Sequence, residues 1–327
     1  MNLFAPWLRT GLLAAAALAI PLAAQAQNAE YPDKPIRLIV PYPPGGGTDV
    51  IARIVQERFQ ALLGQPIIIE NRGGAAGSIG TEVAAKSAPN GYTVLFTLSS
   101  HTINPSIYPK LPFDTAKDFE PVGMVASLPQ ILVANMQFPA NTVAELITLA
   151  KAKPGTLSFA SVGNGSPGHL AGELLKLRTG TQMTHIPYRG GGPAVTDVMG
   201  GQVPMLWVSI PAAAQFVKSG KLKALAVSTQ KRSAAFPDVP TMQEAGVPDF
   251  EVDSWYAMFV PAKTPRPVID KLNRVINTVV REPNIRDKLL AQGSEGVGGT
   301  PEELGKVVST ELARWGKLAR EANIKVD

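Results

Sequence analysis

Short runs of consecutive apolar residues alternate along the chain with longer stretches in which apolar residues recur every three or four positions. Ile36–Val40 is the first such run, and residues 50–63 repeat apolar side chains at helical spacing up to Gly64. The first pattern predicts a buried β-strand and the second an amphipathic helix. Because the strands are apolar on both faces, they predict a mainly parallel sheet flanked by helices, the α/β class.

The alternation occurs in two series. The first continues through strand 66–70, a helix over about 78–88 and strand 92–98, and breaks in the proline-rich, polar stretch 99–120. The second begins with strand 131–134 and ends with a short helix at 241–245. Between these, further strands are predicted at 157–160, 183–187, 203–209 and 222–228. We therefore expect two α/β units.

Two extended stretches, 119–125 and 250–260, lie where the units would exchange chain, and the sequence after Pro261 is mostly helical. Two crossings let the C-terminal helices return to the first unit. We expect one lobe from residues 27–122 plus 253–327 and a second lobe from residues 123–252.

The first 26 residues have the pattern of an export signal. They carry one charge, Arg9, followed by an uncharged apolar stretch from Gly11 to Ala24 and the small-residue pattern Ala24-Gln25-Ala26. These are the three regions of a secretory signal peptide, and the apolar stretch is shorter than a membrane span. Cleavage after Ala26 would leave 301 of the 327 residues. We expect an exported protein, and the absence of cysteine fits the bacterial periplasm.

Composition narrows the chemistry. The chain has no cysteine and three histidines, which excludes disulfides, thiol nucleophiles and cysteine–zinc sites, and it contains no H-E-x-x-H motif. The net charge of +5 is spread along the chain without a run of five basic residues, so we expect no nucleic-acid binding. We expect no metal and no cofactor. The 30 glycines and 29 prolines point to many loops.

One internal similarity links the two units. Residues 40–50 read V-P-Y-P-P-G-G-G-T-D-V, and residues 186–198 read I-P-Y-R-G-G-G-P-A-V-T-D-V. Each segment leads from a predicted strand into a helix. Glycines let a ligand approach the backbone closely, and the unpaired N–H groups at a helix start favour an anion. Two such loops, one from each lobe, would hold one small anion between them; two ordinary strand–helix turns are the alternative.

Catalytic motifs are incomplete. The glycine loops match neither the dinucleotide fingerprint nor a phosphate-binding P-loop. Ser78 and Ser166 lie in sequences similar to a nucleophile elbow, but Pro167 lacks the N–H that an oxyanion hole needs, and Ser78 follows its strand by eight residues. An exported α/β serine hydrolase is the alternative function. A helix cap or a ligand hydroxyl is the better interpretation of both serines.

Several polar residues in predicted loops are candidates for ligand contact. His101 follows a strand in a loop rich in hydrogen-bonding groups, and His169 lies in the first turn of a helix after a Gly/Ser loop. A position on the surface would explain these two histidines as well as a ligand site would. His185 lies in mid-strand and is expected to be structural. Arg189, after the second Pro-Tyr pair, suits a carboxylate or a solvated loop.

A set of motifs in this chain resembles the Bug-type solute receptors, the extracytoplasmic binding proteins of tripartite tricarboxylate transporters. The resemblance covers residues 31–327, and the matching segments are 39–49 (IVPYPPGGGTD), 70–77 (ENRGGAAG), 89–93 (PNGYT), 118–122 (DFEPV), 168–174 (GHLAGEL) and 187–191 (PYRGG). It implies a two-lobe flytrap that closes on a small carboxylate. In this family, backbone N–H groups and waters at loops matching 43–49 and 189–193 hold one carboxylate, and variable residues at 78, 99–104 and 161–169 contact the rest.

We therefore expect a periplasmic receptor without catalytic residues that captures a di- or tricarboxylate, an aromatic carboxylate or a related organic acid. Its expected partners are the integral-membrane subunits of a tripartite transporter, with a sensor kinase as a second candidate, and the receptor is expected to be a monomer. The candidate ligand-binding residues are Tyr42, Pro44, Gly45, Gly46, Gly47, Thr48, Asp49, Ser78, Ser99, His101, Asn104, Ser161, Ser166, His169, Arg189, Gly190, Gly191, Gly192, Asp197 and Ser209.

Overall fold

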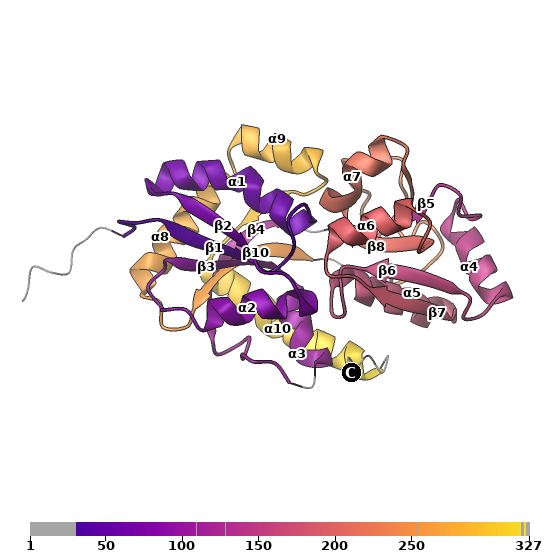
Figure 1. Cartoon of the computed structure of the whole chain (residues 1–327), viewed down its shortest axis with the longest axis horizontal. Coiled ribbons are helices and arrows are strands. Elements are labelled where there is room, and N and C mark those ends of the chain that lie inside the picture. The colour runs from indigo at the N-terminus through magenta and orange to yellow at the C-terminus, as the bar shows by residue number, and fades with distance from the viewer. Residues whose placement is uncertain (1–30, 109, 128, 253, 322–323, 325–327) are drawn as a thin grey trace, which may run out of the picture.

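The computed structural model describes residues 31–108, 110–127, 129–252, 254–321 and 324. Within them the chain forms two β-sheets, each flanked by helices, that lie side by side along the long axis of the molecule (Figure 1). We call the part built around the first sheet lobe 1 and the part built around the second sheet lobe 2. The predicted signal peptide, residues 1–26, lies outside the described residues.

Lobe 1 contains a six-stranded sheet among the described residues, in the order β11-β4-β10-β3-β1-β2. Its strands are β1 (Ile36–Val40), β2 (Ile67–Asn71), β3 (Thr93–Leu98), β4 (Phe119–Ser127), β10 (Trp255–Pro261) and β11 (Gly296–Gly298). Its helices are α1 (Gly47–Leu63), the 3-10 turn η1 (Ala75–Gly77), α2 (Ser78–Ala85), α3 (Ser100–Ile107), α8 (Arg266–Val279), α9 (Pro283–Ala291) and α10 (Pro301–Glu321).

Lobe 2 contains a five-stranded sheet within the described part of the chain, in the order β7-β6-β8-β5-β9. Its strands are β5 (Gln130–Asn135), β6 (Leu157–Ser161), β7 (Met183–Pro187), β8 (Met205–Ser209) and β9 (Leu222–Val227). Its helices are α4 (Val143–Ala152), α5 (Pro167–Thr179), α6 (Gly191–Met199) and α7 (Ile210–Lys218).

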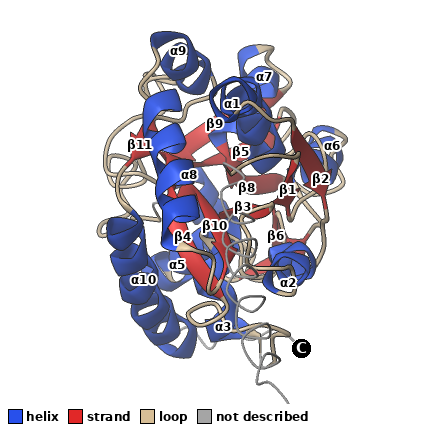
Figure 2. Ribbon diagram, turned by 90° about the vertical axis from the view of Figure 1, so that its left-hand side faces the viewer, coloured by secondary structure: helices blue, strands red, loops and turns tan. Residues whose placement is uncertain are grey.

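Each sheet has an apolar core on both faces, as the uniformly apolar strands predict. In lobe 1, α1, α8 and α9 pack on one face, and α2 and α10 pack on the other. In lobe 2, α4 and α5 cover one face, and α6 and α7 cover the other. Figure 2 looks onto lobe 1, with α1, α8 and α10 around its strands.

The two-lobe α/β fold is as expected, but the sheets are mixed rather than mainly parallel. β1 is parallel to β2 and β3, whereas β10 is antiparallel to β3 and β4, and β5 is antiparallel to β8 and β9. Two of the reversed strands directly follow the crossings: β5 is the first strand after the chain enters lobe 2, and β10 is the first after it returns to lobe 1. The short edge strand β11 is also reversed, because it is antiparallel to β4. An apolar run indicates burial but not strand direction.

The first crossing lies later than the sequence predicted. Residues 123–127, expected in lobe 2, continue β4 and pair with β10 in the sheet of lobe 1. β5 then begins lobe 2 at Gln130. On the return path, Val252 packs in the core of lobe 2, and Trp255 begins β10 in lobe 1.

Two predictions of local structure are wrong. The stretch 99–120, expected to be irregular, contains α3 despite Pro105; the carbonyl oxygen of His101, four residues before the proline, accepts a hydrogen bond from the Thr115 hydroxyl at 3.0 Å. The helix expected at 241–245 is only a turn, which ends at Gly246 with a φ of +91°.

Candidate functional site

The first glycine loop connects β1 to α1 and is shaped by Asp49. The Oδ2 atom of Asp49 accepts hydrogen bonds from the Gly45 N–H and from Arg53, both at 2.9 Å, and Oδ1 accepts one from Asn71 at 3.1 Å. Burial raises the pKa of Asp49, but these donors together hold it below its usual value. The carboxylate is therefore engaged within lobe 1, and it shapes the loop instead of facing a ligand.

The second glycine loop connects β7 to α6. Its Thr196-Asp197 pair does not occupy the same helix position as the Thr48-Asp49 pair of the first loop. Asp49 lies in the first turn of α1, whereas Asp197 lies in the second turn of α6 because three more residues separate it from the glycines. Asp197 Oδ2 accepts a hydrogen bond from the Tyr188 hydroxyl at 2.7 Å. Like Asp49, Asp197 supports its own lobe.

The glycines of the two loops meet across the interface between the lobes. A Cβ atom placed on Gly46 would lie 3.8 Å from the backbone nitrogen of Gly191. A Cβ atom placed on Gly190 would lie 2.7 Å from the Cδ atom of Pro43. The loops thus approach each other so closely that a side chain at residue 190 would separate them.

A cavity of about 20 Å³ lies between the lobes beside these loops. The helices α1, α5, α6 and α7 all begin at its wall, so the positive ends of their dipoles converge there. The space is about that of one water molecule, which shows that the lobes are closed. The cavity is lined by Tyr42, Gly46, Gly47, Thr48, Leu98, Gln130, Val162, Pro167, Gly191, Ser209 and Ala212.

A second polar group lies where α2 and α3 begin. The Asn104 amide nitrogen donates to the Ala76 carbonyl oxygen at 3.2 Å and to the Ser78 hydroxyl at 3.1 Å. The Tyr42 hydroxyl donates to the same carbonyl at 3.1 Å, which links this group to the cavity. Ser99 is fully buried, and its hydroxyl is hydrogen-bonded to the Ser254 hydroxyl at the return crossing.

In lobe 2, two histidines hold the loop between β6 and α5. His185 Nε2 lies 2.6 Å from Ser161 Oγ, which also bonds to Gly163, and His169 Nδ1 accepts from the Gly165 N–H at 3.1 Å. The two imidazole rings stack with centroids 4.0 Å apart. Burial lowers the pKa of His169 to about 4 and that of His185 to about 3, so both are neutral at pH 7.

The same loop contacts lobe 1 at the rim of the cleft. Gly165 lies against Asn104, because a Cβ atom at residue 165 would be 2.5 Å from Asn104 Oδ1. The Tyr108 hydroxyl of lobe 1 donates to the Asn164 carbonyl oxygen of lobe 2 at 3.3 Å. One helical turn into α5, Leu170 packs with α3 and α10 of lobe 1.

The remaining candidates divide between a core and the surface. His101 was expected near the ligand, but its ring is buried against Phe113, Phe119 and Phe259 in the core of lobe 1, where burial lowers its pKa to about 3. Arg189, Pro44 and Gly45 are exposed, and Gly192 is half-buried, all on the two glycine loops.

Comparison with known proteins decides the family. Residues 51–324 match the family described as the tripartite tricarboxylate transporter family receptor. The chain belongs to this receptor family. It is 40% identical to Protein BugT from Bordetella pertussis over 316 residues, which cover 96% of each chain.

Solved structures with the same fold include binding proteins of this kind. The receptor matches the periplasmic binding protein BugD with a TM-score of 0.87 at 35% identity, covering 90% of this chain and 100% of that one. It matches Rpa4515 from R. palustris, solved with adipate, with a TM-score of 0.88 at 34% identity over the same shares. It matches MatC from Rhodopseudomonas palustris, solved with malate, with a TM-score of 0.84 at 32% identity, covering 88% and 99%.

The hydrolase alternative is not supported for this receptor. Its relatives are solute-binding receptors and not enzymes. The Ser166 hydroxyl caps α5 by accepting the His169 N–H at 3.2 Å, and the Ser78 hydroxyl accepts a hydrogen bond from Asn104. The hydroxyls of both serines therefore take part in hydrogen bonds within their own lobes.

Sequence analysis missed two residues of the receptor that lie at the cleft. Gln130, the first residue of β5, lines the cavity, and Tyr256 of β10 lies against the first residue of α1. Both belong to the stretches in which the chain passes between the lobes. A polar residue beside an otherwise apolar run was the available signal for each.

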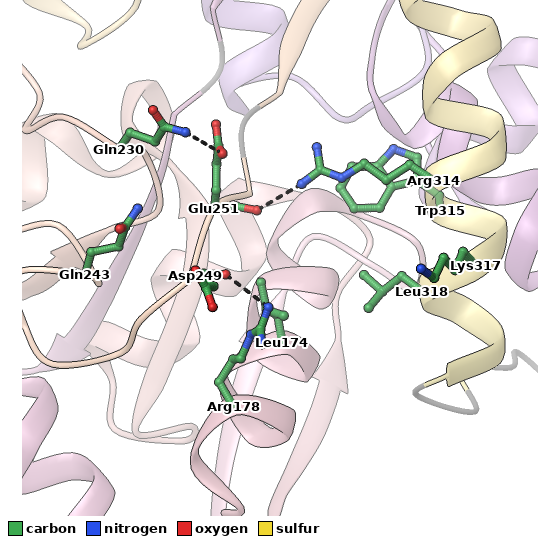
Figure 3. Close-up of a pocket in the computed structure, with 10 residues that line it drawn as sticks. All are labelled: Leu174, Arg178, Gln230, Gln243, Asp249, Glu251, Arg314, Trp315, Lys317 and Leu318. Atoms are coloured by element: carbon green, nitrogen blue, oxygen red, sulfur yellow. Dashed lines mark hydrogen bonds between the residues drawn. The ribbon is translucent and has the colours of Figure 1, made fainter.

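A larger cavity of about 730 Å³ lies away from the glycine loops, between α10 of lobe 1 and α5 with residues 230–251 of lobe 2 (Figure 3). Its polar groups bind one another: Arg314 donates to the Glu251 carbonyl oxygen at 3.3 Å, and Gln230 donates to the Glu251 carboxylate at 2.8 Å. Glu251 lies next to the stretch in which the chain returns from lobe 2 to lobe 1.

Metal-ligand clusters and membrane-spanning helices are both lacking in the described part of the receptor. Within it, no three or more His, Asp or Glu side chains gather as metal ligands would. The helices described here are all too short or too polar to cross a membrane.

Proposed function

We propose that this receptor binds a small organic acid in the cleft between its lobes, with one carboxylate at the N-termini of α1, α5, α6 and α7. The convergence of four helix starts on one enclosed point carries the proposal, because N–H donors and positive dipole ends favour an anion there. Relatives solved with adipate and malate support a carboxylate ligand. We infer that Arg189, which is exposed on the second glycine loop, pairs with a second acidic group of the ligand at the rim.

The cavity in this structure is too small for an organic acid, so we infer that ligand enters a more open cleft, that the lobes rotate about the stretches that link β4 to β5 and Val252 to β10, and that the liganded state is less tightly closed than this one. Ligand then stabilises a closed state through contacts made with both lobes at once. The loops at Gly46 and Gly191 and the residues Ser78, Asn104 and Ser161 supply the expected contacts.

The receptor is proposed to work in the periplasm as a monomer after cleavage behind Ala26, and to deliver its ligand to the membrane subunits of a tripartite transporter, with a sensor kinase as a second possible recipient. Intact mass of protein released by osmotic shock tests the processing. A mass that corresponds to the full 327 residues would contradict it.

A thermal-shift series tests the binding function. Adipate, malate and citrate are compared with adipamide, a neutral molecule of the same length as adipate, at matched ionic strength. A ligand present at a hundred times its Kd adds about 2.7 kcal/mol to stability, which raises Tm by about 5 °C. Adipamide is expected to leave Tm unchanged. The proposal is wrong if no organic acid raises Tm.

A further inference from the structure

Tyr256 places a buried hydroxyl group beside the cleft, next to the hydroxyl of Ser209. It lies in β10 opposite Leu98, which lines the cavity, and its ring stacks on Phe96 with centroids 6.0 Å apart. The side chain is 0% exposed, and within the described residues its Oη atom has no partner in hydrogen-bonding geometry. Burial raises the pKa of the phenol, so the hydroxyl keeps its proton and remains a donor.

The hydroxyl lies at the positive end of α1, where the two lobes meet. A Cβ atom on Gly47, the first residue of α1, would lie 2.7 Å from Tyr256 Oη and 2.3 Å from Ser209 Oγ. Ser209 belongs to lobe 2 and is the N-cap of α7, but its side chain makes no capping bond. Two hydroxyl groups and two helix N-termini therefore lie at one point beside the cavity.

An unsatisfied buried hydroxyl costs free energy, and buried polar groups in folded proteins normally have partners. The nearest polar groups are the Ser209 hydroxyl, which can accept one proton but brings a donor proton of its own, and the first N–H groups of α1, which only donate, so donors outnumber acceptors. An anion is the acceptor that would satisfy all of them, and the dipoles of α1 and α7 favour one at this place. The unpaired hydroxyl therefore points to a missing acceptor on the ligand.

We propose that Tyr256 is a specificity-determining residue whose hydroxyl donates a hydrogen bond to the bound carboxylate at the start of α1, directly or through one water molecule. Ser209 donates to the same group from the opposite lobe, so the full set of donors exists only in the closed state. Such a set accepts a carboxylate and disfavours a carboxamide, whose NH₂ group would face other donors. This inference rests on the proposed function.

The test is the variant Tyr256→Phe, which keeps the stacked ring and removes only the hydroxyl. Kd is measured by calorimetry with whichever of adipate, malate and citrate binds the wild type most tightly, and Tm is measured without ligand. We expect Kd to rise about tenfold or more, because a hydrogen bond to a charged group is lost. We expect the unliganded Tm to stay the same or rise, because an unsatisfied buried group is removed.

Tyr31→Phe is the matched control. The Tyr31 hydroxyl donates to the Gly91 carbonyl oxygen at 2.8 Å on the far side of lobe 1, so its loss should lower Tm and leave Kd unchanged. If Tyr256→Phe behaves like this control, Tyr256 has a structural role and the proposal is overturned while the binding function stands. If the wild type binds none of the three acids, the binding function itself fails, and the role of Tyr256 fails with it.

Discussion

At the scale of single residues, the receptor uses small side chains and backbone groups where an enzyme would use reactive side chains. The cavity wall combines glycines, hydroxyl residues and the starts of helices with Leu98, Gln130 and Val162, and no Lys, Arg or His is among the residues that line it. The acidic residues of the two glycine loops, Asp49 and Asp197, support their own lobes. Closure therefore depends on the absence of side-chain atoms at particular positions.

Gly47 is the position where this dependence is sharpest. A methyl group there would lie 2.3 Å from the Ser209 hydroxyl of the opposite lobe and 2.7 Å from the Tyr256 hydroxyl, so both groups would have to move at once in a tightly packed interior. We expect Gly47→Ala to hold the lobes apart, to raise Kd at least about tenfold and to increase the radius of gyration measured by X-ray scattering with ligand present.

Gly46→Ala is the control for that variant. A methyl group at residue 46 would make contacts of 3.5 and 3.8 Å only, and the backbone φ of −76° suits alanine. Because residue 46 itself lines the cavity, we expect a smaller rise in Kd than for Gly47→Ala and no increase in the radius of gyration. Equal Kd values for Gly47→Ala and the wild type would show that closure does not bring Ser209 against α1.

The meeting of the two glycine loops could be predicted from the sequence, whereas contacts between residues that are distant in the sequence could not. The paired glycine motifs indicated that two loops from two lobes come together, because each follows a strand and begins a helix. The burial of His101 in the core of lobe 1 could not be predicted from such local motifs. Its ring environment is set by Phe119 and Phe259, which are distant in sequence and converge only when β4 and β10 pair.

At the scale of elements, periodicity located most strands and helices but not their directions or their contacts. The sequence of β10 is an ordinary apolar run. Only its antiparallel pairing with β3 places Tyr256 opposite Leu98, which lines the cavity. The contacts between lobes were equally hidden. Leu170 of α5 fits a helical pattern in the sequence. Only the structure shows that its side chain packs against residues of lobe 1, namely Ile103, Ile107 and Trp315.

This apolar contact predicts an effect of Leu170 on closure. Leu170 is 1% exposed among residues of α3 and α10, so truncation to alanine removes apolar contact between the lobes. We expect Leu170→Ala to raise the Kd of the bound acid about tenfold, with a modest fall in Tm.

Leu175→Ala separates closure from general stability. Leu175 lies on the same helix, is 2% exposed and packs in the core of lobe 2. Its truncation should lower Tm at least as much as that of Leu170 while Kd stays near the wild-type value. A parallel change in Kd for both variants would mean that the contact of Leu170 has no special part in closure.

At the scale of the whole molecule, the histidines make stability depend on pH through both lobes. Burial lowers the pKa of His101 in lobe 1 to about 3, and it lowers the pKa values of His169 and His185 in lobe 2 to about 4 and about 3. An unfolded chain binds these protons near pH 6.5, whereas the folded receptor does not. The folded state is therefore fully stable above about pH 6.5 and loses stability as the pH falls toward 4.

The midpoint of urea unfolding, measured between pH 7.5 and 4.5, checks this dependence. Between about pH 6.5 and 4, each histidine that takes up a proton only on unfolding shifts the folding equilibrium toward the unfolded state about tenfold for each unit by which the pH falls. His101→Leu provides the test case, because neither ring nitrogen of His101 has a hydrogen-bond partner within the described structure. The variant should gain stability over the wild type at pH 4.5 and much less at pH 7.5. An equal difference at both pH values would show that His101 already carries its proton in the folded receptor.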